Sequence, residues 1–233
     1  ETVDCRLCGG SAFDTVLGAL NLSIFTQGRV DTESLAAFAD VSIDLTDTLA
    51  LSLGARWTRD DKTGRVYRQN FTGLRTPFFG NAAAVPGLVR TNYTNSAEFE
   101  EVTPRISLTW EPSDALTLYT SYSQGFKSGG FDMRGDAVFT PNTVNGYDPE
   151  FVDTYEVGFH SGFMQGRINL SGAVFYSEYS DMQITRQEPT TTGGIASFVD
   201  NAAEATIKGV ELEGRVFFTD NFSANFAVGY IDG

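Results

Sequence analysis

The chain has 233 residues, with 30 acidic and 16 basic side chains and a formal net charge of −14. Because no basic stripe exists to neutralise phosphates, this charge balance argues against nucleic acid as a partner. The sequence contains no run of about eighteen apolar residues, so it predicts no transmembrane helix, and its first ten residues, ETVDCRLCGG, show neither the basic nor the apolar region of a signal peptide.

Residues 1–33 show weak periodicity and are predicted to form a loop or partial strand region, with at most one short strand near residues 17–25. Cys5 and Cys8 lie here in a C-x-x-C arrangement. A zinc site needs about four ligands and only His160 is available elsewhere, so no metal site is expected. No βαβ pattern follows, which argues against a redox motif. A local disulfide between the two cysteines is favoured over free thiols, because the compartment inferred below is oxidising.

Regular alternation begins at Ser34. Apolar residues recur at every second position through residues 37–45, and the pattern resumes through residues 49–57 after Thr46-Asp47-Thr48. A period of two is typical of a strand with one apolar face, so these residues predict a β-hairpin with a tight turn.

Three further hairpins follow the same plan, over residues 98–127, 154–184 and 202–230, with turns near residues 112–114, 164–166 and 219–221. Longer irregular stretches separate the hairpins, at residues 62–97, 128–149 and 187–200. Pro104 interrupts one strand and suggests a bulge or a strand start. Strands of roughly ten residues exceed the usual five or six of soluble sheets, and short turns opposite long loops are typical of outer-membrane barrels.

The predicted fold is therefore all-β: an antiparallel up-and-down meander of about eight long strands over residues 34–233, part of a transmembrane β-barrel. A soluble sheet packed on one face explains the alternation equally well, but explains the strand length and the one-sided loops less well. If the apolar face meets lipid, the opposite face is predicted to line the lumen; its charged and polar residues are Asp40, Arg56, Glu101, Arg105, Glu156, His160, Glu211, Glu213 and Arg215.

Sequence features of catalysis are sparse. His160 is the only histidine and lies on the polar face of a predicted strand, where a hydrogen-bonded wall residue is the more common role. The chain has no G-x-S-x-G, and residues 125–130, GFKSGG, lack the spacing of a phosphate loop. No enzyme activity, catalytic residue or cofactor is therefore predicted.

Five stretches, in order along the chain, resemble the barrel domain of TonB-dependent outer-membrane receptors: residues 103–110 (TPRISLTW), 118–131 (LYTSYSQGFKSGGF), 148–158 (DPEFVDTYEVG), 179–184 (YSDMQI) and 205–213 (ATIKGVELE). The resemblance covers residues 34–233. It implies part of a barrel of about 22 strands, located in the outer membrane of a Gram-negative bacterium and surrounded by its lipid. It also implies uptake of a scarce small-molecule nutrient such as a ferric siderophore, driven by the TonB complex.

Within this resemblance the chain corresponds to an internal part of the barrel, without the plug and without the TonB box through which that complex acts. Cationic and aromatic side chains of the extracellular loops suit anionic or catecholate iron chelates. The candidate ligand contacts are Arg75, Phe78, Phe79, Arg90, Tyr93, Phe131, Arg134 and Tyr147.

Two alternatives remain from the sequence. Eight strands cut from a larger barrel leave two open edges, which predicts self-association through strand pairing and an extracellular, filament-forming structural protein. The other alternative is a soluble one-layer β domain for adhesion.

Overall fold

The computed structural model describes residues 22–73, 76–189 and 195–233. Cys5, Cys8 and Arg75 lie outside these residues, as does the side chain of Phe79. The described residues form eight strands and two short 3-10 turns: β1 (Leu22–Thr46), β2 (Leu49–Thr72), η1 (Pro77–Phe79), β3 (Val85–Ser113), β4 (Leu116–Lys127), η2 (Pro141–Asn145), β5 (Glu150–Phe163), β6 (Ile168–Pro189), β7 (Ile195–Thr219) and β8 (Phe222–Asp232).

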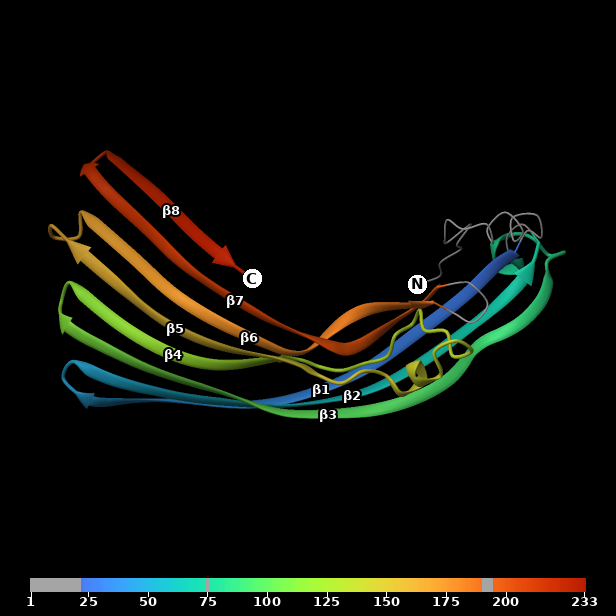
Figure 1. Cartoon of the computed structure of the whole chain (residues 1–233). Coiled ribbons are helices and arrows are strands. Elements are labelled where there is room, and N and C mark those ends of the chain that lie inside the picture. The colour runs from blue at the N-terminus through green and yellow to red at the C-terminus, as the bar shows by residue number, and fades with distance from the viewer. Residues whose placement is uncertain (1–21, 74–75, 190–194) are drawn as a thin grey trace.

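All eight strands belong to one sheet in the order β1 to β8, and each pairs antiparallel with the next. Tight turns join β1 to β2, β3 to β4, β5 to β6 and β7 to β8 at one end of the sheet. The predicted up-and-down meander of about eight long strands is confirmed. Figure 1 shows the sheet as a strongly curved, open trough. No helix of the described residues is long and apolar enough to cross a membrane.

Several strands are longer than the sequence predicts, and two of the three irregular stretches are shorter, whereas the third, residues 128–149, separates β4 from β5 as predicted. β1 starts at Leu22 rather than near residue 34, and only residues 73–84 separate β2 from β3 instead of residues 62–97. β6 ends at Pro189 and β7 begins at Ile195, so both strands extend into residues 187–200, the stretch expected to form a loop. The prediction failed because these extensions carry charged and polar residues on their faces, and backbone pairing needs no apolar alternation.

Pro104 lies within β3 opposite Ala55, with no bulge in the register at that point. The pairing of β3 with β4 ends at Arg105, one residue away. The proline therefore stands where β3 loses one neighbour, a position in which a missing backbone donor is tolerated.

A one-layer sheet has little interior, and the cluster of buried apolar residues found among the described residues lies at the far ends of β1 and β2. Phe25 and Phe71 are 4% and 3% exposed there and contact Ala84 of the β2–β3 connection. Phe78 of η1 stacks on Phe25 with ring centroids 4.0 Å apart. The β2–β3 connection thus folds back over these strands and covers their ends.

Candidate functional site

The strand register divides the sheet into a polar and an apolar face. Side chains alternate between the faces along a strand, and directly paired residues share a face. By this rule the residues expected from sequence at the lumen share one face, hereafter the polar face: Asp40, Arg56, Glu101, Arg105, Glu156, His160, Glu211, Glu213 and Arg215. That this face borders a lumen stays a prediction.

Side chains of the polar face form local pairs near the turn end of the sheet. The Tyr119 hydroxyl donates to Glu156 Oε1 over 2.7 Å, and the His160 ring stacks on Tyr119 with centroids 5.5 Å apart. His160 Nδ1 lies 3.0 Å from Ser171 Oγ. Among the described residues, no group of three or more metal-ligating side chains is close enough to hold an ion. His160 is therefore placed as part of a hydrogen-bonded wall.

The connection between β4 and β5, residues 128–149, crosses the polar face and is called here the strap. β4 and β5 are shorter than β3 and β6, which leaves room above them for this segment. Figure 1 shows the strap, in yellow, inside the trough between the far ends of β1–β3 and β6–β7. The strap therefore lies where a ligand entering the trough from the loop end would arrive.

Side chains from four strands bind the backbone of the strap. From β2, Lys62 Nζ donates to Gly129 O over 2.6 Å and Arg68 Nη1 donates to Arg134 O over 2.7 Å. From β3, Asn95 Nδ2 donates to Val144 O over 2.8 Å.

On the opposite side, Gln183 of β6 and Asn201 of β7 donate to Asp148 O over 3.0 and 2.8 Å. Asn201 Oδ1 also accepts the amide of Asp148 at 2.8 Å. The strap thus links strands that are not neighbours in the sheet, and these contacts hold it in one position.

Two buried carboxylates organise the strap from within. Asp136, 3% exposed, forms an ion pair with Arg90, whose guanidinium also lies 4.4 Å from the centroid of the Phe139 ring. Asp132, 6% exposed, accepts hydrogen bonds from the backbone of Arg134 and from the amide of Val199 on β7. Buried charges are tolerated when they are paired and hydrogen-bonded in this way.

Burial under the strap shifts the titration of nearby groups. Desolvation lowers the pKa of Arg68. Desolvation also raises the pKa of Tyr93 to about 12, with a smaller contribution from the negative charge of Asp132. Arg68 Nε and the Tyr93 hydroxyl have no hydrogen-bond partner among the residues that the structure describes. Burial also raises the pKa of Tyr147. These groups beneath the strap are thus shielded from solvent, and two of them are donors without a hydrogen-bond partner among the described residues.

The structure separates the predicted ligand contacts into two groups. Arg90, Tyr93 and Phe131 are built into the packing beneath the strap; the Phe131 ring is only 5% exposed. Arg134 retains a side chain that is 60% exposed, and Tyr147 is half-buried. Phe78 is exposed, but it lies at the tip of the sheet on Phe25.

Sequence reasoning missed the residues that hold the strap: Asp132, Asp136, Gln183 and Asn201. Gln183 belongs to one of the stretches that resemble the receptor family and Asp132 directly follows another, but no local pattern indicates that their partners lie on distant strands. Their role depends on contacts between residues 35 to 67 positions apart.

The seating of the strap requires a glycine at position 64. A Cβ built on Gly64 of β2 would lie 2.6 Å from the Cδ2 and Cγ atoms of the Phe131 ring. We expect Gly64→Val to unseat the strap, because neither the ring nor the strand backbone has room to move. Limited proteolysis of the protein in detergent should then cleave within residues 128–149. Gly229→Val, at an open position on the same face of β8, is the control, and equal cleavage of both variants would contradict the expectation.

The opposite face of the sheet is apolar over the half nearest the tight turns. Its outward residues include Leu35, Val41, Val102, Ile106, Val157, Val174, Val210 and Val228, which are all exposed. The series ends abruptly on each strand, where the next residue on the same face, two positions farther from the tight turn, is charged or polar. A continuous exposed apolar band of this kind suits the hydrocarbon of a membrane rather than water.

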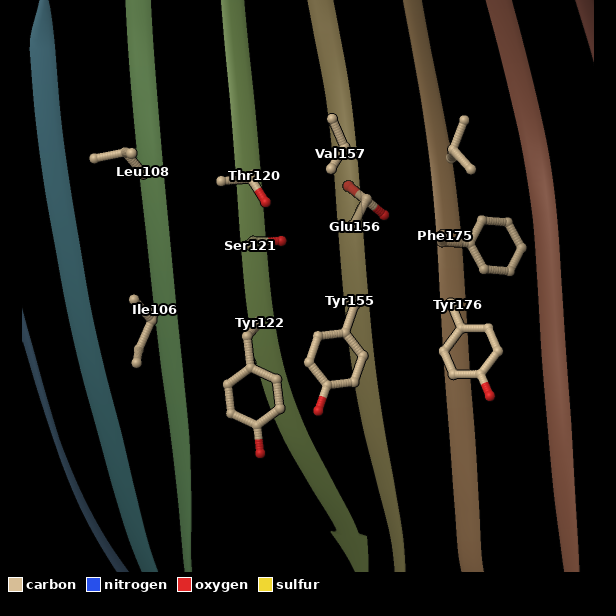
Figure 2. A pocket seen from close by; sticks show the side chains of 11 residues that line it. Ile106, Leu108, Thr120, Ser121, Tyr122, Tyr155, Glu156, Val157, Phe175 and Tyr176 are labelled. Carbon is tan, nitrogen blue, oxygen red and sulfur yellow. The ribbon is translucent and has the colours of Figure 1, made fainter.

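A row of tyrosines marks the edge of this band. Tyr122, Tyr155 and Tyr176 are directly paired on β4, β5 and β6, and Figure 2 shows their rings side by side with the hydroxyls pointing the same way. Tyr122 donates to Asp153 Oδ1 over 2.6 Å and Tyr176 donates to Glu178 Oε1 over 3.0 Å.

Trp57 Nε1 donates to Glu100 Oε1 over 2.8 Å in the same manner. Each aromatic side chain thus presents its ring to the band and its polar atom to the charged region beyond it, as in the girdles of membrane barrels. A shallow groove of about 450 Å³ lies beside the tyrosine row, lined by Ile106, Leu108, Thr120, Val157, Val174 and the three tyrosines, with parts of Ser121, Glu156 and Phe175.

Comparison with known proteins gives one family match over almost the whole chain. The model of the TonB-dependent receptor-like β-barrel matches residues 7–233. A probable TonB-dependent siderophore receptor, PiuA of Acinetobacter baumannii, is 27% identical over 86% of this chain and 24% of its own length. A ferric-pyoverdine 358 receptor of Pseudomonas putida is 27% identical over 82% of this chain and 20% of its own length.

Solved structures show the same fold. The ferric yersiniabactin uptake receptor FyuA of Yersinia pestis aligns with a TM-score of 0.68 at 22% identity, over 90% of this chain and 28% of that one. The siderophore receptor PiuA of A. baumannii aligns with a TM-score of 0.60 at 21% identity, over 91% of this chain and 26% of that one. The chain spans about a quarter of the length of the curated relatives it matches.

Proposed function

The chain belongs to the family of TonB-dependent receptor β-barrels, and from that premise we propose that it forms part of the wall of a receptor that takes up a ferric siderophore. The protein lies in the outer membrane of a Gram-negative bacterium. The apolar band then contacts outer-membrane lipid, the polar face lines the lumen, and the tight turns lie at the periplasmic end. The family match over residues 7–233 is the observation that carries the proposal.

The ligand class follows from the relatives and from the trough. Two relatives are named for siderophores or their ferric complexes, and the strap carries an exposed guanidinium on Arg134. A guanidinium pairs well with the carboxylate or phenolate oxygens of such chelates. Energy for release into the periplasm would come from the TonB complex acting on a plug region outside these residues.

Uptake of radioactive iron by whole cells tests this function. We expect cells that express the complete gene to accumulate iron from a ferric siderophore under iron limitation, and expect accumulation to stop when the TonB gene is deleted. The matched control is the same strain without the receptor gene. Equal accumulation in the strains with and without the receptor gene, over a panel of catecholate, hydroxamate and carboxylate siderophores, would contradict the proposal.

Self-association through strand edges is the second candidate. Among the described residues, β1 and β8 each pair with one strand only, so one edge of each strand has unpaired backbone groups. If these edges pair between copies, the purified protein should form ordered filaments in buffer without detergent. Electron microscopy of the purified protein distinguishes the two candidates. Dispersed particles that need detergent to stay in solution would contradict self-association and support the receptor function.

A further inference from the structure

We propose that Asp132 is a positioning residue that holds the Arg134 guanidinium toward the trough, where it binds an oxygen anion of a ferric chelate. This inference rests on the proposed uptake function and adds a named contact and its support. Asp132 and Arg134 are separated by a single residue of the strap.

Four contacts fix Arg134. Its backbone amide donates to Asp132 Oδ1 over 2.8 Å, and its side-chain Nε donates to the same oxygen over 3.2 Å. Nη2 donates to Thr185 Oγ1 of β6 over 3.3 Å. Its carbonyl accepts Arg68 Nη1 at 2.7 Å. The backbone and the side chain are therefore both oriented, and no hydrogen bond within the described residues uses Nη1.

Asp132 is itself anchored. Its second oxygen, Oδ2, accepts the backbone amide of Val199 on β7 at 3.0 Å, and its side chain is 5% exposed. The Arg134 side chain is 60% exposed. A buried carboxylate with a fixed partner thus supports an exposed cation, and a cation held in this way loses less conformational entropy when a ligand binds.

The charge around this pair favours an anion. Arg68, Arg90 and Arg134 lie around Asp132 and Asp136, so this cluster of five side chains carries one more positive than negative charge. The chain as a whole has a net charge of −14. A local excess of positive charge in an acidic protein attracts anions.

Removal of the Asp132 charge separates positioning from electrostatic attraction. Asp132→Asn makes the strap more positive, so simple attraction predicts tighter binding of an anionic ligand. Positioning predicts weaker binding, because the Nε contact loses its charged acceptor and the guanidinium is no longer fixed. The matched control is Asp148→Asn, which also removes one negative charge from the strap. The Asp148 carboxylate makes no hydrogen bond within the described residues, so this change alters the charge without releasing a held side chain.

The first measurement needs no ligand. In the complete receptor in detergent, the rate at which an arginine-specific dicarbonyl reagent modifies Arg134 is followed by peptide mass spectrometry. We expect Asp132→Asn to raise this rate several-fold and Asp148→Asn to leave it unchanged. Hydrogen exchange at the amides of Gly130 and Tyr147, which bond to each other's carbonyls over 3.0 and 2.8 Å, reports whether the strap is still seated.

The second measurement is calorimetric binding of two probes, an anionic ferric tris-catecholate and a cationic ferric trihydroxamate. We expect Asp132→Asn and Arg134→Gln each to weaken binding of the anionic probe about tenfold, with Asp148→Asn close to wild type. Unchanged or tighter binding by Asp132→Asn, at an unchanged modification rate, would overturn the inference while the proposed function stands. If the wild type binds neither probe and its cells take up no ferric siderophore, the proposed function fails; the modification rate still shows whether Asp132 holds Arg134.

Discussion

Replacing Asp136 with alanine is expected to undock the strap and to cost about 3 to 5 kcal/mol of stability, the usual loss when one partner of a buried ion pair is removed. Arg90, its partner, is 14% exposed and lies against Phe139. An uncompensated guanidinium cannot remain there, so the strap is expected to lift and expose it to water. The measurement is hydrogen exchange along residues 128–149, together with urea unfolding in detergent.

Asp220→Ala is the matched control for this change. Asp220 also faces an arginine, with 3.8 Å between Asp220 Oδ1 and Arg167 Nη2, but its side chain is 96% exposed. Exposed pairs of this kind contribute little to stability, so this variant should unfold like the wild type. Protection of the strap amides that is identical in Asp136→Ala and in the wild type would show that the Arg90–Asp136 pair does not hold the strap.

The sequence predicts the half of the sheet that carries the apolar band. There the environment differs between the faces, so residues such as Val102, Ile106 and Leu108 alternate with polar ones and the period of two is visible. The four tight turns follow from the breaks in this pattern. Resemblance to a known family supplied what the pattern alone left open, namely whether the sheet is part of a membrane barrel or a soluble sheet packed on one face.

The far half of the sheet and the strap could not be predicted in the same way. Beyond Trp57, β2 continues through Arg59, Asp61 and Arg65 with no apolar face, as is expected where a barrel strand extends out of the lipid into water. The strap contains buried aspartates and glycines, which in sequence indicate a loop. Its order comes from side chains such as Asn201, 53 residues distant from Asp148, and no local pattern reports such a contact.

Introducing arginine at Ile106 should have the second large effect. Ile106 is the middle of the outward positions of β3, from Val102 to Trp110, and is 45% exposed on the apolar face. Figure 2 shows its side chain beside the tyrosine row. An arginine on the lipid face of a barrel costs about 2 to 4 kcal/mol near the midplane of the membrane. Because Ile106 is only half-buried by protein, most of this cost would come from placing the arginine charge in lipid rather than from disturbed packing within the protein.

Ser107→Arg provides the control on the next residue of the same strand. Ser107 points to the polar face, opposite Ser52 and Ser121, where small neighbours leave room for a long side chain and water can solvate its charge. We expect this variant to lose less than about 1 kcal/mol. Urea unfolding in phospholipid vesicles measures both variants. A larger loss for Ser107→Arg than for Ile106→Arg would reverse the assignment of the two faces, and with it the lumen-facing position of the strap and of Arg134.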